Sequence, residues 1–114
     1  SIENVAKAKG EIYEILPPDG KAILNIDEAF CSMWREKIGT KEIITYGLKN
    51  EAMITAHDIA LQPFSVEFTL QIPGKQQRVK MNIPGKHTVM NALAAASCGV
   101  ALGITLDHIV AGLE

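Results

Sequence analysis

The sequence predicts an α/β fold with a partial parallel sheet, flanking helices and a three-strand antiparallel meander. Over the first 47 of its 114 residues, helical spacing of apolar residues alternates with short apolar runs, as in half of a parallel α/β sheet. Residues 52–83 then form three extended runs with partial alternation, joined by short turn-rich links. Residues 86–114 return to helical spacing. No repeat or long linker divides the chain, so we expect a single unit.

The first 47 residues contain alternating helices and strands. Apolar residues three or four apart predict the helices, and short apolar runs ending in polar residues predict buried strands. A proline pair followed by Asp19-Gly20 separates the first helix from the first strand. In order, we expect a helix at 1–16, a strand at 21–27, a helix at 28–38 with Gly39 as its C-cap, and a strand at 42–47.

The middle of the chain predicts the meander. Its three runs are "AMITAHDIAL", "SVEFTLQI" and "QRVKMNI". In the second run, polar and apolar residues alternate strictly, which predicts one buried and one wet face. The apolar set of that run is Val66, Phe68, Leu70 and Ile72.

Two helices are expected at the end of the chain. The first covers residues 86–102 and is stopped by Gly103. The second begins at residue 106, with Thr105 as N-cap and Asp107 favourable in its first turn. The apolar stretch from Ala92 to Leu102 predicts a buried helix, because it is too short to span a bilayer.

Composition narrows the classes of function. Hydrophobic residues make up 47% of the chain, so a core can be buried and global disorder is not expected. The net charge of −2 provides no basic footprint for nucleic acid or for an anionic membrane. Cys31 and Cys98 are far apart in different contexts, which favours free thiols in a reducing compartment and hence the cytoplasm.

The usual signatures of a complete active site are absent from the sequence. Three Gly-Lys pairs occur, but none has both the upstream glycine and the following Ser or Thr that a phosphate-binding P-loop needs. The three histidines, His57, His87 and His108, lack metal-binding spacing. No G-x-S-x-G or H-E-x-x-H motif is present. Composition and spacing therefore establish an α/β domain without identifying a reaction.

The stretch "IPGKHTVMNALAAAS", residues 83–97, begins an apolar helix with polar side chains. His87 and Asn91 are four residues apart and share one face of its N-terminus. Backbone N–H groups there lack helical partners, which suits an anionic or acceptor-rich ligand. Asn91 offers both a donor and an acceptor, as an adenine edge requires. The alternative is an ordinary solvated first turn, and spacing alone leaves both interpretations open.

A second stretch, "AKAKGEIYE", places Lys7 and Lys9 on a helix whose other residues are apolar or acidic. One interpretation is an ordinary pair of solvated lysines. The other is that one lysine points inward, where burial would favour its neutral and reactive amine.

Together, "AKAKGEIYE", the strand "AILNID" and "PGKHTVMNALAAA" after a three-strand meander resemble the Mur ligases. These are ATP-dependent enzymes that add amino acids or dipeptides to the cell-wall precursor. The resemblance covers essentially the whole chain, and its order of elements is similar to the second half of the family's central ATP-binding domain. Within the family, "SIENVAKAKGEI" is most similar to the member that adds D-alanyl-D-alanine to the UDP-linked muramoyl tripeptide.

The resemblance implies a reaction and its reactants. ATP phosphorylates the substrate carboxylate to an acyl phosphate, the incoming amine attacks, and phosphate leaves as the amide forms. Two Mg²⁺ ions neutralise the developing charge. The implied cofactors are ATP and Mg²⁺, and the implied partners are the small molecules UDP-N-acetylmuramoyl tripeptide and D-alanyl-D-alanine. The implied setting is bacterial peptidoglycan synthesis in the cytoplasm, with no nucleic acid or membrane partner.

The resemblance also assigns roles to residues that match the family's motifs. Lys9 falls on the lysine that CO2 converts to a carbamate, an anionic ligand for the second magnesium site, and Lys7 is the alternative. Asn91 falls on the asparagine that contacts the adenine of ATP. His87 begins the same motif and is expected near the nucleotide. The family usually has Asn directly after this histidine, whereas this chain has Thr88, so no contact is implied from that position.

Asn25 and Asp27 match the family's Asn-x-Asp at the end of a strand. In α/β sheets, ligand sites lie beyond the carboxyl ends of the strands, so both residues are candidates for the ATP side of the site. A purely structural role is the alternative, and the resemblance does not decide between them.

Further parts of the family pattern would lie outside this chain. The P-loop, the glutamate and histidine ligands of magnesium and the UDP-binding domain would precede Ser1, and the C-terminal domain would follow Glu114. Residues 1–114 are therefore expected to be a fragment of the central domain that is inactive alone and carries an unmodified Lys9. An exposed sheet edge could let such a fragment self-associate.

Two other functions remain open from the sequence. One is a stand-alone α/β ligand-binding or interaction module without catalysis. The other is a relative of folylpolyglutamate synthase, which shares the domain and the reaction but not the substrate. The stretch "VAKAKGEI" favours the Mur ligase over the latter.

Overall fold

The computed structural model describes residues 4, 7, 20–28, 31–39, 41–49 and 51–114. The helix expected at 1–16 lies outside these residues except for Asn4 and Lys7, which are helical and exposed. The other expected elements are present, and several of their ends differ from the expected bounds by one to three residues. They are β1 (Lys21–Asn25), α2 (Cys31–Ile38), β2 (Glu42–Tyr46), β3 (Thr55–Leu61), β4 (Val66–Ile72), β5 (Lys75–Met81), α3 (Lys86–Ala101) and α4 (Leu106–Leu113).

The first two strands form a parallel β-α-β unit. β1 and β2 pair in parallel along their whole length, and α2 connects them. Gly39 has a φ of 64°, a left-handed conformation that glycine adopts without strain, and it ends α2 as expected. The two carboxyl ends, Asn25 and Tyr46, are register partners. Any residues that follow these ends are therefore neighbours in space.

A small hydrophobic core holds α2 on β1. Ala22 and Leu24 alternate along the strand and are buried, as period-two patterning requires. Trp34 and Ile38 lie one helical turn apart on α2 and are buried against them. Full burial of one such large apolar side chain contributes roughly 1.5–3 kcal/mol, which explains how an eight-residue helix stays docked.

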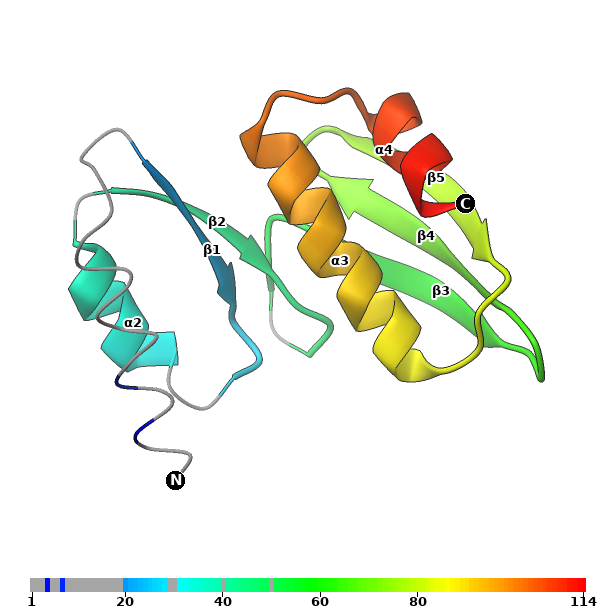
Figure 1. The fold of residues 1–114 in the computed structure, drawn as a ribbon, viewed down its shortest axis with the longest axis horizontal. Coiled ribbons are helices and arrows are strands. Elements are labelled where there is room, and N and C mark those ends of the chain that lie inside the picture. Colours follow the sequence, from blue (N-terminus) through cyan, green and yellow to red (C-terminus); the bar gives the residue numbers. More distant parts are fainter. Residues whose placement is uncertain (1–3, 5–6, 8–19, 29–30, 40, 50) are drawn as a thin grey trace.

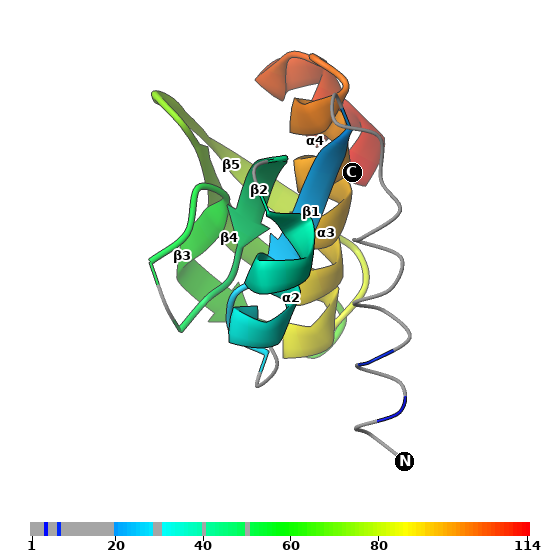
Figure 2. The same ribbon diagram turned by 90° about the vertical axis from the view of Figure 1, so that its left-hand side faces the viewer.

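The three-strand antiparallel meander is confirmed, with β4 between β3 and β5. Val66, Phe68 and Leu70 of β4 are fully buried, and Ile72 is half-buried, so the expected inward face is correct. The polar residues between them face the other side, which is the bare side of the sheet in Figure 2.

The hairpin between β4 and β5 is tighter than the sequence predicted. Ile72 pairs with Lys75, so the turn contains only Pro73 and Gly74. Gly74 has a φ of 77°, and a two-residue hairpin turn requires such a conformation. As a result, β5 begins at Lys75, two residues before the expected run.

Helix α3 joins the two sheets. It contacts β1 and β2 of the parallel sheet as well as β3 and β4 of the meander. Figure 1 shows α3 crossing the junction between the sheets, and Figure 2 shows α3 and α4 on the same side of the meander. The main core lies between these helices and the sheet. Its buried members are Ile44, Ile54, Ala56, Val66, Phe68, Leu70, Val79, Val89, Ala92, Leu93, Ala96, Leu106, Ile109 and Val110.

One stripe of α3 departs from the expectation of a buried helix. Ala95 and Cys98 are exposed, and so is Leu102, the C-cap residue that follows α3, which keeps 77% of its surface accessible. The opposite stripe is buried and includes Ser97, whose hydroxyl donates to the Leu93 carbonyl oxygen at 2.7 Å. The apolar run misled the sequence-based prediction because small side chains such as alanine are compatible with either face of a helix.

The connection between the last two helices follows the expected signals. Gly103 ends α3 with a φ of 75°. Thr105 occupies the N-cap position of α4, but its hydroxyl does not cap the backbone and lies 3.0 Å from His108 Nδ1 instead. No helix among the described residues is long and apolar enough to cross a membrane.

Candidate functional site

The start of α3 is fixed by the backbone rather than by a polar cap. Gly85, the N-cap, has a φ of 101°, where a β-carbon would be strained. The Thr88 N–H donates to the Gly85 carbonyl oxygen at 3.1 Å, and the Thr88 hydroxyl donates to the Pro84 carbonyl oxygen at 3.0 Å. The polar groups of Thr88 are therefore hydrogen-bonded to the backbone of the helix start, and only 8% of its surface is exposed. His87, by contrast, stays exposed.

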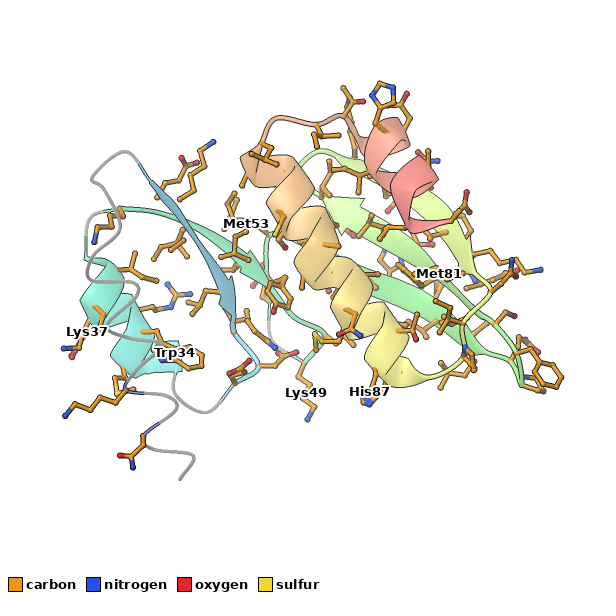
Figure 3. The ribbon with its side chains drawn as sticks, viewed as in Figure 1. Trp34, Lys37, Lys49, Met53, Met81 and His87 are labelled. Atoms are coloured by element: carbon orange, nitrogen blue, oxygen red, sulfur yellow. The ribbon has the colours of Figure 1, made fainter. Side chains whose placement is uncertain are left out.

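A cavity of about 300 Å³ lies between this helix start and the loop that follows β2. His87 lies on one side of it and Lys49 on the other, and Figure 3 shows both side chains projecting from the same edge of the molecule. Apolar side chains from both walls complete the lining. The lining residues are Leu48, Lys49, Lys86, His87 and Met90.

Asp27 ties the loop after β2 to the end of β1. Its Oδ2 accepts a hydrogen bond from the Leu48 N–H at 2.6 Å, and both carboxylate oxygens lie 3.1 Å from the Lys49 N. Asn25 supports this arrangement, because its Oδ1 accepts from the Asp27 N–H at 3.0 Å. The Asn-x-Asp motif thus connects the carboxyl ends of the two parallel strands.

Gly47 is held from several directions in this loop. Its N–H donates to the Ile54 carbonyl oxygen at 3.2 Å, and its own carbonyl oxygen accepts from the Thr55 hydroxyl at 2.8 Å. A β-carbon at position 47 would lie 2.9 Å from Asp27 Oδ1, closer than real contacts allow. Only glycine leaves room for the carboxylate to reach the two N–H groups beyond it.

The structure brings together some of the predicted site residues and separates others. His87 lines the cavity, and Asn25 and Asp27 support its far wall. Asn91 is exposed one turn further along α3, outside the lining of the cavity. Lys9 lies outside the described residues.

Sequence reasoning missed the second wall of this cavity. Leu48 and Lys49 directly follow the predicted strand at 42–47. The rule that α/β sites lie beyond the carboxyl ends of strands could have identified them, since the same rule selected Asn25 and Asp27. Lys86 was considered only as the first residue of the helix and as part of a Gly-Lys pair that does not form a P-loop.

The cavity has a cationic rim and an apolar floor. Lys49 and Lys86 bring basic side chains to the cavity, and the first N–H groups of the 16-residue α3 add partial positive charge. Leu48 and Met90 supply the apolar surface. Next to the loop, burial raises the pKa of the Tyr46 phenol above its usual range, with smaller contributions from the Glu28 carboxylate and Cys98. The two lysines together with the apolar surface of Leu48 and Met90 suit a ligand that has an anionic part and an apolar part.

The described residues contain no group of three or more His, Cys, Asp or Glu side chains that could hold a metal ion. The only magnesium ligand expected from the sequence was Lys9, as a carbamate, and it is not among them.

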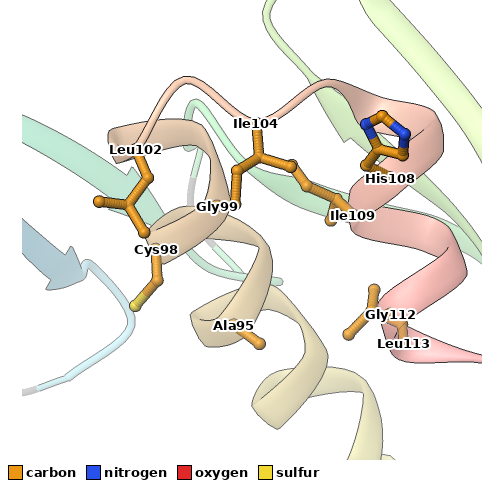
Figure 4. Close-up of a pocket in the computed structure, with 9 residues that line it drawn as sticks. All are labelled: Ala95, Cys98, Gly99, Leu102, Ile104, His108, Ile109, Gly112 and Leu113. Atoms are coloured by element: carbon orange, nitrogen blue, oxygen red, sulfur yellow. The ribbon is translucent and has the colours of Figure 1, made fainter.

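A second cavity, of about 330 Å³, is a groove between the C-terminal part of α3 and α4. Its lining is largely apolar, and Figure 4 shows the Cys98 sulfur and the His108 imidazole at opposite ends of it. The two groups therefore do not form a nucleophile–base pair, which would need hydrogen-bond contact.

Comparison with known proteins identifies the fold and the family. Residues 1–99 match the family model described as the Mur ligase middle domain. The chain belongs to the Mur ligase family. It is 42% identical over 115 residues to the UDP-N-acetylmuramoyl-tripeptide–D-alanyl-D-alanine ligase of Escherichia coli (strain K12), covering 99% of this chain and 25% of the relative.

Other Mur ligases are also similar. A UDP-N-acetylmuramoyl-L-alanyl-D-glutamate–2,6-diaminopimelate ligase of Clostridium acetobutylicum is 36% identical over 96% of this chain and 22% of its own length. The crystal structure of MurF from Acinetobacter baumannii superimposes with a TM-score of 0.92 at 34% identity, over 100% of this chain and 25% of the other. The chain thus spans about a quarter of the relatives that it matches. The expected Mur ligase central-domain fold is confirmed.

Proposed function

We propose that this chain forms part of the central domain of an ATP-dependent ligase that adds D-alanyl-D-alanine to UDP-N-acetylmuramoyl tripeptide in peptidoglycan synthesis. The nucleotide part of the proposal rests on the cavity at the start of α3, where Lys49 and Lys86 are among the lining residues. The relative at 42% identity is named for this same reaction. Family membership favours a ligase over a stand-alone binding module.

The residues around the cavity fit a nucleotide. Leu48 and Met90 offer apolar surface for a base, and Lys49 and Lys86 offer charge for phosphates. When bound, ATP supplies the phosphoryl group that activates the substrate carboxylate for attack by the amine. In this proposal the chain's own residues bind and orient the nucleotide, and phosphate contacts beyond Lys49 and Lys86 come from other parts of the longer protein.

Roles for the predicted residues follow from their positions. Asn91 contacts the adenine with its donor and acceptor, and its exposed side chain is accessible for that contact. His87 lines the cavity at the start of the same helix. Asn25 and Asp27 are on the ATP side of the site, but they act through the loop that they hold.

Lys9 is proposed to carry a carbamate that takes part in the second magnesium site of the full-length ligase. A carbamate replaces a cation by an anionic oxygen ligand, which is the kind of ligand that Mg²⁺ prefers. Intact-mass measurement of the full-length enzyme tests this proposal, because a carbamate adds the mass of one CO2 and Lys9→Ala would remove it.

The reaction can be tested with the full-length ligase that carries this chain. We expect ATP-dependent phosphate release and a new amide product from UDP-N-acetylmuramoyl tripeptide with D-alanyl-D-alanine. The matched controls use the amines in the names of other relatives, 2,6-diaminopimelate and L-alanine, each with its own UDP-linked acceptor. Turnover with either of these and none with D-alanyl-D-alanine would assign the chain to another Mur ligase. Because the chain covers about a quarter of its relatives, we expect no turnover from the 114 residues alone.

A further inference from the structure

The carboxylate of Asp27 accepts hydrogen bonds from the backbone of a loop. The two donor residues lie 21 and 22 positions further along the chain. It accepts from two successive N–H groups, those of Leu48 and Lys49, at 2.6 and 3.1 Å. Hydrogen bonds to an ionised acceptor are roughly twice as strong as neutral ones. A carboxylate that receives two of them fixes the loop backbone strongly.

Hydrogen bonds also hold the two ends of the same loop together. Gly47 exchanges hydrogen bonds with Ile54 and Thr55, and the Ile54 N–H donates to the Thr45 carbonyl oxygen at 3.0 Å. The space that a β-carbon at Gly47 would occupy is filled by the Asp27 carboxylate. Asp27 and Gly47 therefore form one device, which we call the Asp27–Gly47 latch.

The latch controls one wall of the cavity but does not line it. Leu48 and Lys49, whose N–H groups it holds, form the wall opposite His87 and Met90. Asp27 and Gly47 are not among the lining residues. A change in the latch would therefore alter the cavity by moving Leu48 and Lys49, without removing any side chain that lines it.

We infer that Asp27 is a positioning residue for the nucleotide: with Gly47, it holds Leu48 and Lys49 in the conformation that binds ATP. The inference rests on the proposed function and separates two roles that the Asn-x-Asp motif left open. Loss of the latch adds the ordering of the loop to the free energy of binding, so affinity falls. The chemical step is unaffected once ATP is bound, since no latch atom lines the cavity.

The test uses two variants of the full-length ligase with opposite designs. Asp27→Asn keeps the shape of the side chain but replaces one acceptor oxygen by a donor that faces the loop N–H groups. Gly47→Ala keeps the carboxylate and displaces it with the added β-carbon. The matched control is Asp58→Asn, an exposed aspartate in β3 at a φ of 51°, which asparagine also tolerates.

Three quantities are measured: the Kd of ATP by calorimetry, the KM of ATP together with kcat, and amide hydrogen exchange at Leu48 and Lys49. We expect both latch variants to exchange these two amides faster, to bind ATP roughly tenfold more weakly and to raise the KM of ATP by a similar factor, because one lost charged hydrogen bond corresponds to about that change. We expect kcat within about twofold of the wild-type value and the Asp58→Asn control to match the wild type.

The outcomes separate the latch from the proposed function. A wild-type enzyme that does not bind ATP overturns the proposed function itself. A wild-type enzyme that binds ATP, with variants that bind it equally well despite faster amide exchange, overturns the latch alone. A fall in kcat at unchanged Kd also overturns the inference, since it would place Asp27 in the chemical step. If Asp27→Asn does not fold, Gly47→Ala decides alone, because it retains the charge.

Discussion

The side-chain ammonium of Lys21, in β1, donates a hydrogen bond of 3.1 Å to the carbonyl oxygen of Ala101, the last residue of α3. The two residues are 80 positions apart, and the bond places a cation where the helix dipole is negative. The same ammonium lies 3.9 Å from the Glu42 carboxylate of β2. One side chain therefore links the parallel sheet to the helix that also covers the meander.

We expect Lys21→Met to lower the free energy of unfolding by about 0.3–1 kcal/mol, the usual contribution of a partly exposed cation at a helix C-terminus. The measurement is urea unfolding of the variant beside Lys75→Met, which removes an exposed lysine of β5. High salt should shrink the difference, since it screens exposed charges. Equal stability of the two variants at low salt would show that the contact contributes nothing.

The close approach of α3 and α4 gives a second prediction. A β-carbon at Gly99 would lie 2.8 Å from the Ile109 Cγ1, whereas one at Gly112 would meet nothing within 4 Å. Overpacking costs about 1–3 kcal/mol, and replacing a helical glycine by alanine contributes up to about 1 kcal/mol. We therefore expect Gly99→Ala to destabilise the protein by about 1 kcal/mol and Gly112→Ala to stabilise it slightly. Thermal unfolding of both variants checks the prediction, which fails if their order is reversed.

The raised pKa of Tyr46 predicts that the protein loses stability at alkaline pH. Burial is the main cause that raises the pKa of its phenol, followed by the Glu28 carboxylate and Cys98. The folded state therefore holds the proton more tightly than the unfolded state, whose phenol titrates near 10. The stabilisation is fully present below that pH and is lost as pH rises from there through the folded pKa. Tyr46→Phe should remove this part of the pH dependence of the free energy of unfolding, and identical slopes for variant and wild type above pH ~10 would contradict it.

Much of the fold could be predicted from the sequence because local signals and burial agree. The strand at 21–27 and the helix at 28–38 follow from apolar spacing and from Gly39. The inward set of β4 follows from strict alternation. The tight hairpin at Gly74 was missed because β5 begins with the polar residues Lys75 to Arg78. They show no alternation of apolar and polar residues that would indicate the start of a strand.

The candidate site was predictable only in part, because it depends on contacts between distant residues. The helix start at His87 and the motif with Asn25 and Asp27 were visible as patterns. Leu48 and Lys49 could be placed only as residues beyond a strand end, since the conformation of the wall that they form depends on hydrogen bonds to Asp27 across more than 20 residues. No local propensity records such a contact, and the residues that form it are unremarkable in isolation.

The central claim is that a nucleotide binds at the start of α3, and it can be tested most directly at Asn91, the residue proposed to contact the adenine. The decisive measurement is the Kd of ATP for the full-length ligase with Asn91→Ala, beside the matched control Asn82→Ala, an exposed asparagine just before the helix. Loss of one or two hydrogen bonds of about 0.5–1.5 kcal/mol each predicts that Asn91→Ala binds ATP roughly two- to a hundredfold more weakly and that the control is unchanged. Unchanged ATP affinity in Asn91→Ala would contradict the claim.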